Sequence, residues 1–140
     1  MTTGLQFTYL YHDDDIVELG VTVSNGRFSG STDVYIATDG TAEIVETLKG
    51  FPTNPQDTRD YTLGAFGPTY AGGAVHLHFF CRDRAGHATL KATVEDNFDK
   101  LPFTQQSVVL LEFEPAALDR FLAALPDLER NHAGTATLLG

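Results

Sequence analysis

The sequence predicts a single α+β domain, in which a mainly antiparallel sheet of six or seven strands carries two amphipathic helices. Three observations predict this class. Stretches of alternating apolar and polar residues are joined by turn signals. Two other stretches, residues 40–50 and 115–125, change to helical spacing. A chain of 140 residues that is 42% hydrophobic has enough apolar surface for one core but is too short for two domains. Helices with one apolar stripe each are expected to pack on a sheet face.

Three consecutive strands are predicted at the start of the chain. Residues 16–24 resume the alternation after a turn at residues 12–15, so they form a hairpin with residues 5–11. Asn25-Gly26 is a strong tight-turn signal, because both residues tolerate the positive φ of such turns, and it leads to a third strand at residues 28–37. In the first strand, the period of two places four residues on one face: Leu5, Phe7, Tyr9 and Tyr11.

The first helix is predicted over residues 40–50. Its apolar residues, Ile44, Val45 and Leu48, recur at helical spacing. Asp39 or Thr41 can cap its beginning, and Gly50 can adopt the left-handed conformation that ends a helix. Two prolines then break regular structure, so residues 51–60 are a connection that leads to a short strand at residues 61–66.

Residues 74–83 and 87–96 form the clearest predicted hairpin. If Ala85 and Gly86 make a two-residue turn, His76 lies opposite Glu95, and both share a face with His78. The other face is apolar and is expected to be buried: Val75, Leu77, Phe79, Cys81, Leu90, Ala92 and Val94.

The last third of the chain is predicted to contain a strand, a helix and a final short strand. Residues 107–113 are apolar on both faces, which favours a central strand. Pro115 suits the first position of a helix over residues 115–125, and Pro126 is expected to end it, before a possible strand at residues 135–139. The core is expected to include Leu77, Phe79, Leu90, Val109, Leu111 and Phe121.

Composition excludes several function classes. Nine Lys and Arg against 19 Asp and Glu give a net charge of −10, which opposes binding to nucleic acid or to anionic lipid. No apolar run reaches the length of a membrane span and no signal peptide is recognised, so a cytoplasmic protein is expected. The single cysteine, Cys81, excludes an intrachain disulfide and a multi-cysteine zinc site.

The most suggestive chemical motif is His76-Leu77-His78. Two histidines two residues apart on a strand project to one side and can chelate a cation together, and Glu95 would complete a metal site of two imidazoles and a carboxylate. Arg82 and Lys91 share that face, however, which favours an ordinary polar sheet face over a metal site. No cofactor is therefore expected.

No catalytic residues are predicted. The serines do not occur in a Gly-x-Ser-x-Gly motif. A nucleophilic thiol needs a base within hydrogen-bond reach, and alternation points Cys81 away from His78. Cys81 is better interpreted as a small apolar residue of the core. The sequence therefore favours a protein that is not an enzyme.

Acidic residues are concentrated in the first half of the chain. Residues 1–70 contain ten Asp and Glu and three Lys and Arg, for −7, so these side chains can form a surface that meets a basic protein partner. Solubility alone would also explain the excess. The candidate partner-binding residues are Asp13, Asp14, Asp15, Glu18, Asp33, Glu43 and Glu46.

Landmarks along nearly the whole chain also resemble a family of small uncharacterised bacterial proteins. The landmarks are Phe28-x-Gly30 before Val34-Tyr35, the run Leu48-Lys49-Gly50-Phe51-Pro52, Leu63-Gly64, Gly86-His87 and Glu114-Pro115-Ala-Ala-Leu-Asp. That family is similar to the stand-alone immunity proteins of polymorphic toxin systems, including the WapI-immunity-like group. The resemblance implies an immunity-type inhibitor that occludes a basic toxin domain. The alternative function is a small-ligand or metal-binding domain that uses the His76/His78 face.

Overall fold

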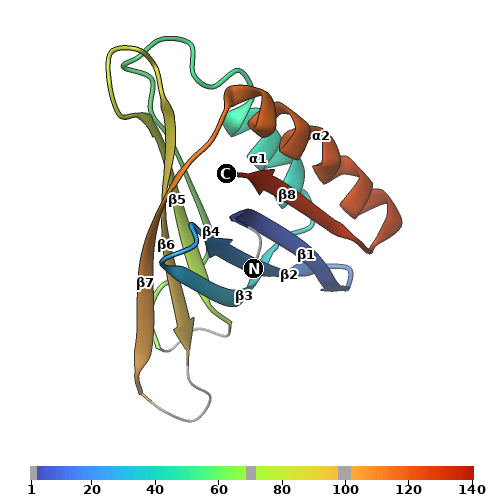
Figure 1. Ribbon diagram of the computed structural model, residues 1–140. Coiled ribbons are helices and arrows are strands. Elements are labelled where there is room, and N and C mark those ends of the chain that lie inside the picture. The colour runs from blue at the N-terminus through green and yellow to red at the C-terminus, as the bar shows by residue number, and fades with distance from the viewer. Residues whose placement is uncertain (1–2, 69–71, 98–101) are drawn as a thin grey trace.

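The computed structural model describes residues 3–68, 72–97 and 102–140 as two antiparallel sheets and two helices (Figure 1). The first sheet, sheet A, has the strand order β3-β2-β1-β8, and the second, sheet B, has the order β4-β5-β6-β7. In chain order the elements are β1 (Gly4–His12), β2 (Ile16–Ser24), β3 (Ser29–Ala37), α1 (Gly40–Leu48), β4 (Arg59–Gly64), β5 (Ala74–Cys81), β6 (Ala88–Asn97), β7 (Thr104–Glu112), α2 (Pro115–Asn131) and β8 (Thr135–Leu139).

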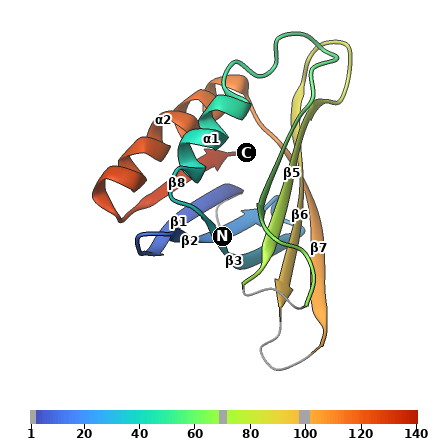
Figure 2. The ribbon, with the colours of Figure 1, turned by 180° about the vertical axis from the view of Figure 1, so that it is seen from behind.

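The α+β class and the two helices are confirmed, but the prediction of one sheet of six or seven strands is wrong. The described strands divide into two sheets of four. The physical reason is burial, because each sheet has one apolar face that two short helices cannot cover alone. Sheet A runs across sheet B, and the edge strand β3 contacts strands of sheet B (Figures 1 and 2). The apolar faces of the two sheets therefore help to bury each other.

The helices lie on one side of sheet A and complete the core. Helix α2 contacts β8 and α1, and α1 also contacts β4 of sheet B. Phe121 of α2 packs edge-on against Phe7 of β1, with 5.2 Å between ring centroids. All six residues expected in the core are fully or almost fully buried: Leu77, Phe79, Leu90, Val109, Leu111 and Phe121.

The face assignment of the β5–β6 hairpin is confirmed, but its register is wrong by two residues. Cys81 pairs with Ala88, so the turn spans residues 82–87 and is wider than two residues. Asp83 supports this wider turn, because its carboxylate accepts hydrogen bonds from the main-chain N–H and the Nδ1 of His87 at 3.3 and 2.7 Å. A shift of two residues keeps the same side chains on each face.

The prediction that residues 107–113 form a central strand is also wrong. Strand β7 is at the edge of sheet B and pairs only with β6 among the described strands. Its inner residues Val109 and Leu111 are buried, whereas Val108 and Leu110 on the outer face are about half exposed. The β2–β3 turn covers part of this edge, because Asn25 Nδ2 donates a hydrogen bond to the carbonyl oxygen of Leu110 at 2.9 Å.

Pro126 does not end the second helix. Helix α2 continues to Asn131, with Pro126 inside it, and ends at His132 in the left-handed conformation. Leu125 and Leu128 on either side of the proline are buried. Their burial in the core outweighs the local cost of a proline in a helix.

Candidate functional site

The site begins at the tip of the β1–β2 hairpin, where three aspartates are consecutive. Asp13 shapes the turn, because its Oδ1 accepts hydrogen bonds from the main-chain N–H groups of Asp15 and Ile16 at 2.8 and 2.9 Å. These two hydrogen bonds lower the pKa of the Asp13 carboxyl below its ordinary value. Asp14 and Asp15 are exposed, so the tip presents negative charge to the solvent.

A β-bulge next to this tip turns the Tyr11 side chain to the outer face of sheet A. Tyr9 pairs with Leu19 and Tyr11 pairs with Glu18, so Leu10 is the extra residue on β1. Tyr11 therefore shares the outer face of sheet A with Glu18, and it does not join Leu5, Phe7 and Tyr9 in the core as the simple alternation predicted. Leu10 and Tyr11 are 47% and 55% exposed.

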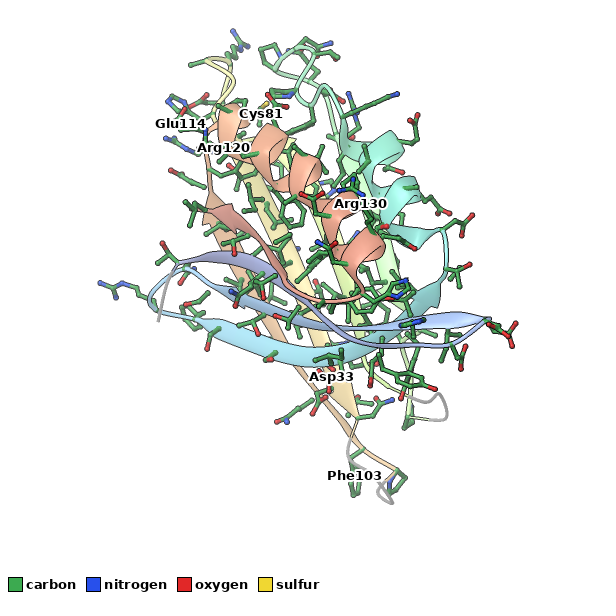
Figure 3. All side chains as sticks on the ribbon, turned by 90° about the vertical axis from the view of Figure 1, so that its right-hand side faces the viewer. Asp33, Cys81, Phe103, Glu114, Arg120 and Arg130 are labelled. Atoms are coloured by element: carbon green, nitrogen blue, oxygen red, sulfur yellow. The ribbon has the colours of Figure 1, made fainter. Side chains whose placement is uncertain are left out.

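Strand β3 adds two more side chains to this outer face. Tyr35 lies across from Glu18, and Asp33 lies across from Gly20. A Cβ on Gly20 would be 3.5 Å from both Asp33 Oδ1 and Leu10 Cδ1, so the glycine leaves room for these two side chains to meet above it. Figure 3 shows Asp33 on the side of sheet A away from the helices. The loop at Gly72 packs against the Tyr35 ring, since a Cβ there would be 2.8 Å from Tyr35 Cδ2.

Together these residues form a surface that we call the acidic–aromatic face. It combines exposed apolar side chains with carboxylates, and no Lys or Arg of the described strands projects from the outer face of sheet A. Arg27 is in the turn at the opposite end of the β2–β3 hairpin from Asp13–Asp15. The face consists of Leu10, Tyr11, Glu18, Asp33, Tyr35 and the hairpin tip Asp13–Asp15.

Glu43 and Glu46 do not belong to this face, although they were predicted to bind the partner together with its carboxylates. Both are on α1, and the helices lie on the other side of sheet A. Glu43 accepts a hydrogen bond from Tyr61 of β4, and burial together with this carboxylate raises the pKa of Tyr61 to about 12. Glu46 forms an exposed ion pair with Lys49 at 3.0 Å. These two glutamates therefore have partners within the chain.

The outer face of sheet B carries the two histidines. Asp60 Oδ1 is 2.8 Å from His76 Nε2 and 2.9 Å from His78 Nδ1, so one carboxylate oxygen binds both imidazoles. Partial burial raises the pKa of Asp60, but the hydrogen bonds from His78 and His76 outweigh burial and lower it overall. The sequence pattern does not indicate Asp60, because residues 51–60 are predicted as a connection, whereas β4 begins at Arg59.

Thr62, His76 and Asp60 form a chain of hydrogen bonds that resembles a hydroxyl–imidazole–carboxylate triad. Thr62 Oγ1 is 3.1 Å from His76 Nδ1. The chain lies on an open sheet face, where the Asp60 side chain is 52% exposed. A nucleophilic triad also needs donors for an oxyanion and shielding from water, and this exposed face does not supply the shielding.

The expected position of Glu95 opposite His76 is wrong. His76 pairs with Thr93, and Glu95 pairs with Ala74. Glu95 is buried, and its carboxylate accepts hydrogen bonds from the Gly67 N–H at 2.7 Å and from Gln106 Nε2 at 2.9 Å. Burial raises the pKa of Glu95, but these hydrogen bonds lower it overall. Within residues 3–68, 72–97 and 102–140, no three His, Cys, Asp or Glu side chains are grouped so that they could hold a metal ion.

Cys81 is at the end of β5 and is partly buried against the core. Burial raises the pKa of its thiol, and the charges of Asp57 and Asp83 raise it further. A raised pKa keeps the sulfur in the thiol form and opposes a nucleophilic role.

Comparison of the chain with protein-family models, with curated proteins and with solved structures finds no match. The resemblance to immunity proteins therefore stays a prediction. None of the helices in the described part of the chain has the length and apolar character needed to span a membrane.

Proposed function

We propose that this chain is a non-enzymatic binding protein that neutralises a basic protein partner with the acidic–aromatic face. One observation carries the proposal: the bulge at Leu10 brings Leu10 and Tyr11 next to the carboxylates of Glu18 and Asp33, on a face without Lys or Arg in the described strands. The resemblance to immunity proteins supplies the class of partner, a basic toxin domain.

The apolar members of the face supply contact area. Large aromatic side chains contribute most of the binding energy at many protein interfaces, because they bury much area at a small entropic cost. Tyr11 and Tyr35 are 55% and 36% exposed and lie on either side of Glu18. Both rings can therefore enter one interface, and the Tyr11 hydroxyl can donate a hydrogen bond at its rim.

The carboxylates supply recognition of charge. Negative side chains around an interface accelerate association with a positive partner and disfavour partners of the wrong charge. Asp14 and Asp15 at the exposed hairpin tip are suited to this steering, whereas Glu18 and Asp33 lie between the apolar side chains and can pair with Lys or Arg of the partner. The negative side chains of Glu43 and Glu46 lie away from this face and add only to the overall charge.

The proposal is tested by co-expression with the protein that the adjacent gene encodes, if that protein is a toxin. The wild-type chain should restore growth, and the purified pair should bind with low-nanomolar affinity or better, about −12 kcal/mol. Tyr11→Ala should weaken binding by about 2 kcal/mol. Phe28→Ala is the matched control, because Phe28 is also an exposed aromatic residue but lies in the turn between β2 and β3.

Two outcomes would contradict the proposal. In the first, an active toxin from the adjacent gene kills the host in the presence of this chain, and no complex is detected. In the second, a complex forms but Tyr11→Ala and Phe28→Ala weaken it equally, which would place the interface elsewhere on the molecule.

A further inference from the structure

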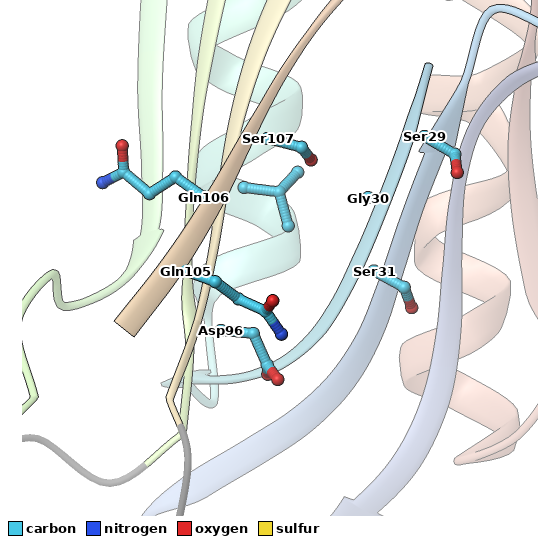
Figure 4. Close-up of a pocket in the computed structure, with 8 residues that line it drawn as sticks. Ser29, Gly30, Ser31, Asp96, Gln105, Gln106 and Ser107 are labelled. Atoms are coloured by element: carbon cyan, nitrogen blue, oxygen red, sulfur yellow. The ribbon is translucent and has the colours of Figure 1, made fainter. Parts of the chain in front are cut away.

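A polar pocket of about 220 Å³ lies where the edge of sheet A crosses sheet B (Figure 4). Strand β3 forms one wall and strands β6 and β7 form the other. Figure 4 shows Asp96, Gln105 and Ser107 on the second wall directed towards β3. The pocket is separate from the acidic–aromatic face, and it is lined by Ser29, Gly30, Ser31, Val94, Asp96, Gln105, Gln106 and Ser107.

The first wall is the free edge of a strand. In an antiparallel strand, alternate residues direct their main-chain N–H and C=O away from the neighbouring strand. The Asp33 carbonyl oxygen accepts a hydrogen bond from the Gly73 N–H at 2.8 Å, so the main-chain groups of Asp33 are directed away from β2 and towards sheet B. Ser31 is two residues earlier on β3, so its main-chain N–H and C=O have the same direction. The Ser31 side chain is on the outer face, where its Oγ is 3.0 Å from Thr22 Oγ1. Ser31 therefore contributes its main chain to the pocket.

The second wall contains a buried hydroxyl without a partner. Ser107 Oγ is buried and makes no hydrogen bond within the described residues. It lies against Gly30, because a Cβ on Gly30 would be only 2.0 Å from it. Buried polar groups in native proteins are nearly always hydrogen-bonded to protein, water or ligand. This hydroxyl therefore needs a donor or acceptor that the described part of the protein does not supply.

The pocket also has a defined charge. Asp96 supplies a carboxylate whose Oδ1 accepts a hydrogen bond from Thr32 Oγ1 at 2.8 Å, which fixes its position. No Lys or Arg of the described residues lines the pocket. A ligand with a positive group is therefore favoured, and a ligand with a carboxylate would meet Asp96 without a compensating cation.

From these contacts we propose that the pocket binds the N-terminal end of a peptide. The α-ammonium group lies against Asp96, and the following amide extends the free edge of β3 by hydrogen bonding to the main chain of Ser31. Strand addition of this kind uses main-chain hydrogen bonds for affinity. The chain already uses the same edge in this way at its next position, where Gly73 bonds to Asp33. Ser107 Oγ and the Gln105 amide bond to the peptide from the other wall.

The ligand is tested with the dipeptide amide Gly-Ala-NH₂ and the isolated ¹⁵N-labelled chain. Titration should shift the amide resonances of Ser31, Gln105 and Ser107 along a saturable curve, with an affinity of about 1 mM expected for so small a ligand. Blocking the α-amino group with an acetyl group should weaken binding by about tenfold or more, because the charge-assisted contact with Asp96 is lost. Ethylamine, which has the ammonium group without the amide, should bind more weakly than the dipeptide amide.

Two variants locate the binding. Asp96→Asn keeps an acceptor for the Thr32 hydroxyl and should weaken the binding of Gly-Ala-NH₂ by about tenfold. Asp119→Asn removes one exposed charge from α2, which contributes no residue to the lining of the pocket, and should leave binding unchanged. The amide spectrum of each variant shows whether the fold is intact.

Three results would overturn the inference: no saturable shift, equal binding of the acetylated peptide, or equal binding of ethylamine. If Asp96→Asn does not fold, Ser107→Ala provides the second test. It removes only the unpartnered hydroxyl, so it should weaken binding of the peptide without lowering the stability of the protein. Unchanged binding by Ser107→Ala would then overturn it. The experiment needs no partner protein, so its failure leaves the proposed function unaffected.

Discussion

At the scale of single residues, partly buried carboxylates hold the connections of this chain in place. Asp57 is an example from the segment between α1 and β4. Its Oδ2 accepts hydrogen bonds from Thr53 N and Thr53 Oγ1 at 2.8 and 3.1 Å, and its carboxylate pairs with Arg59 at 2.9 Å. Arg59 in turn donates to the carbonyl oxygens of Thr47 and Lys49 at 3.0 Å. This network ties the end of α1 to the start of β4.

Replacing Asp57 by Asn is expected to lower the free energy of unfolding at neutral pH by about 1 to 2 kcal/mol. The Arg59 hydrogen bond, with those from Thr53, lowers the pKa of Asp57 to about 2, while burial opposes the shift. A lowered folded-state pKa stabilises the protein above the ordinary value of about 4, and this contribution is lost as the pH falls through about 2. Urea denaturation of both proteins should therefore show a difference at pH 7 that shrinks below about pH 4.

Glu46→Gln is the control for this prediction. Glu46 also pairs with a cation, Lys49, but the two side chains are 70% and 61% exposed, so the pair is well solvated. Its loss should change the free energy of unfolding by less than about 0.5 kcal/mol. An equal effect of the two substitutions would mean that the Asp57 network contributes no more than a surface ion pair.

At the scale of elements, the alternation of residues predicted which side chains share a face, but not how many partners a strand has. All eight strand segments named from the sequence are present in the structure. Strand β7 has apolar residues on both faces, yet one face is open to solvent because β7 is at an edge. Strand number and order depend on contacts between segments far apart in the chain, and a local period contains no information about them.

Two adjacent leucines of β7 test this description of the edge strand. Leu111 is 3% exposed and Leu110 is 54% exposed. Leu111→Ala should lower the free energy of unfolding by about 2 to 5 kcal/mol, because it leaves a cavity in the core. Leu110→Ala should lower it by less than about 0.5 kcal/mol. Urea denaturation measures both, and a large loss for Leu110→Ala would show that its face is covered.

Pro126 is the second test at this scale. A proline in the interior of a helix lacks the N–H group for a main-chain hydrogen bond and costs about 3 kcal/mol. Replacing Pro126 by Ala would remove this cost. The Pro126 ring also lines a groove with Ala42 and Val45 of α1, however, so the loss of its contacts offsets part of the gain in stability. Pro126→Ala should therefore raise the free energy of unfolding by about 1 kcal/mol. A decrease in thermal and urea stability would mean that the packing of the ring outweighs the missing hydrogen bond.

At the scale of the whole molecule, the candidate site depends on features that a period of two does not reveal. Asp13–Asp15, Glu18 and Asp33 were identified from the sequence because charge is visible in composition. Tyr11 was not, because the bulge in β1 reverses the face of every residue after it. Leu10 lies on the outer face as the alternation predicts, but an apolar side chain there is not visible in the charge pattern. A run of Tyr9, Leu10 and Tyr11 before an acidic turn is the only signal of this surface in the sequence, and it does not indicate where the extra residue lies.

The fold also places two groups of negative charge on opposite sides of sheet A. The hairpin tip and the outer face of sheet A hold one group, and helices α1 and α2, on the other side of sheet A, hold residues such as Glu46 and Asp119. If the net charge alone attracted a basic partner, removal of charge from either group would have the same effect. If the partner docks on the acidic–aromatic face, position matters as well as number.

The double variant Asp14→Asn/Asp15→Asn should therefore slow association with the proposed basic partner by about tenfold at low ionic strength, with little change in the dissociation rate. Asp13 is left intact because its carboxylate holds the turn. The matched control Glu46→Gln/Asp119→Asn also removes two exposed charges, but from the helices, and should slow association much less. In stopped-flow measurements the difference between the two variants should disappear as salt is raised, since the Debye length shortens to about 3 Å at 1 M. Equal slowing by both variants would show that only the net charge attracts the partner, and the hairpin tip would then have no part in docking.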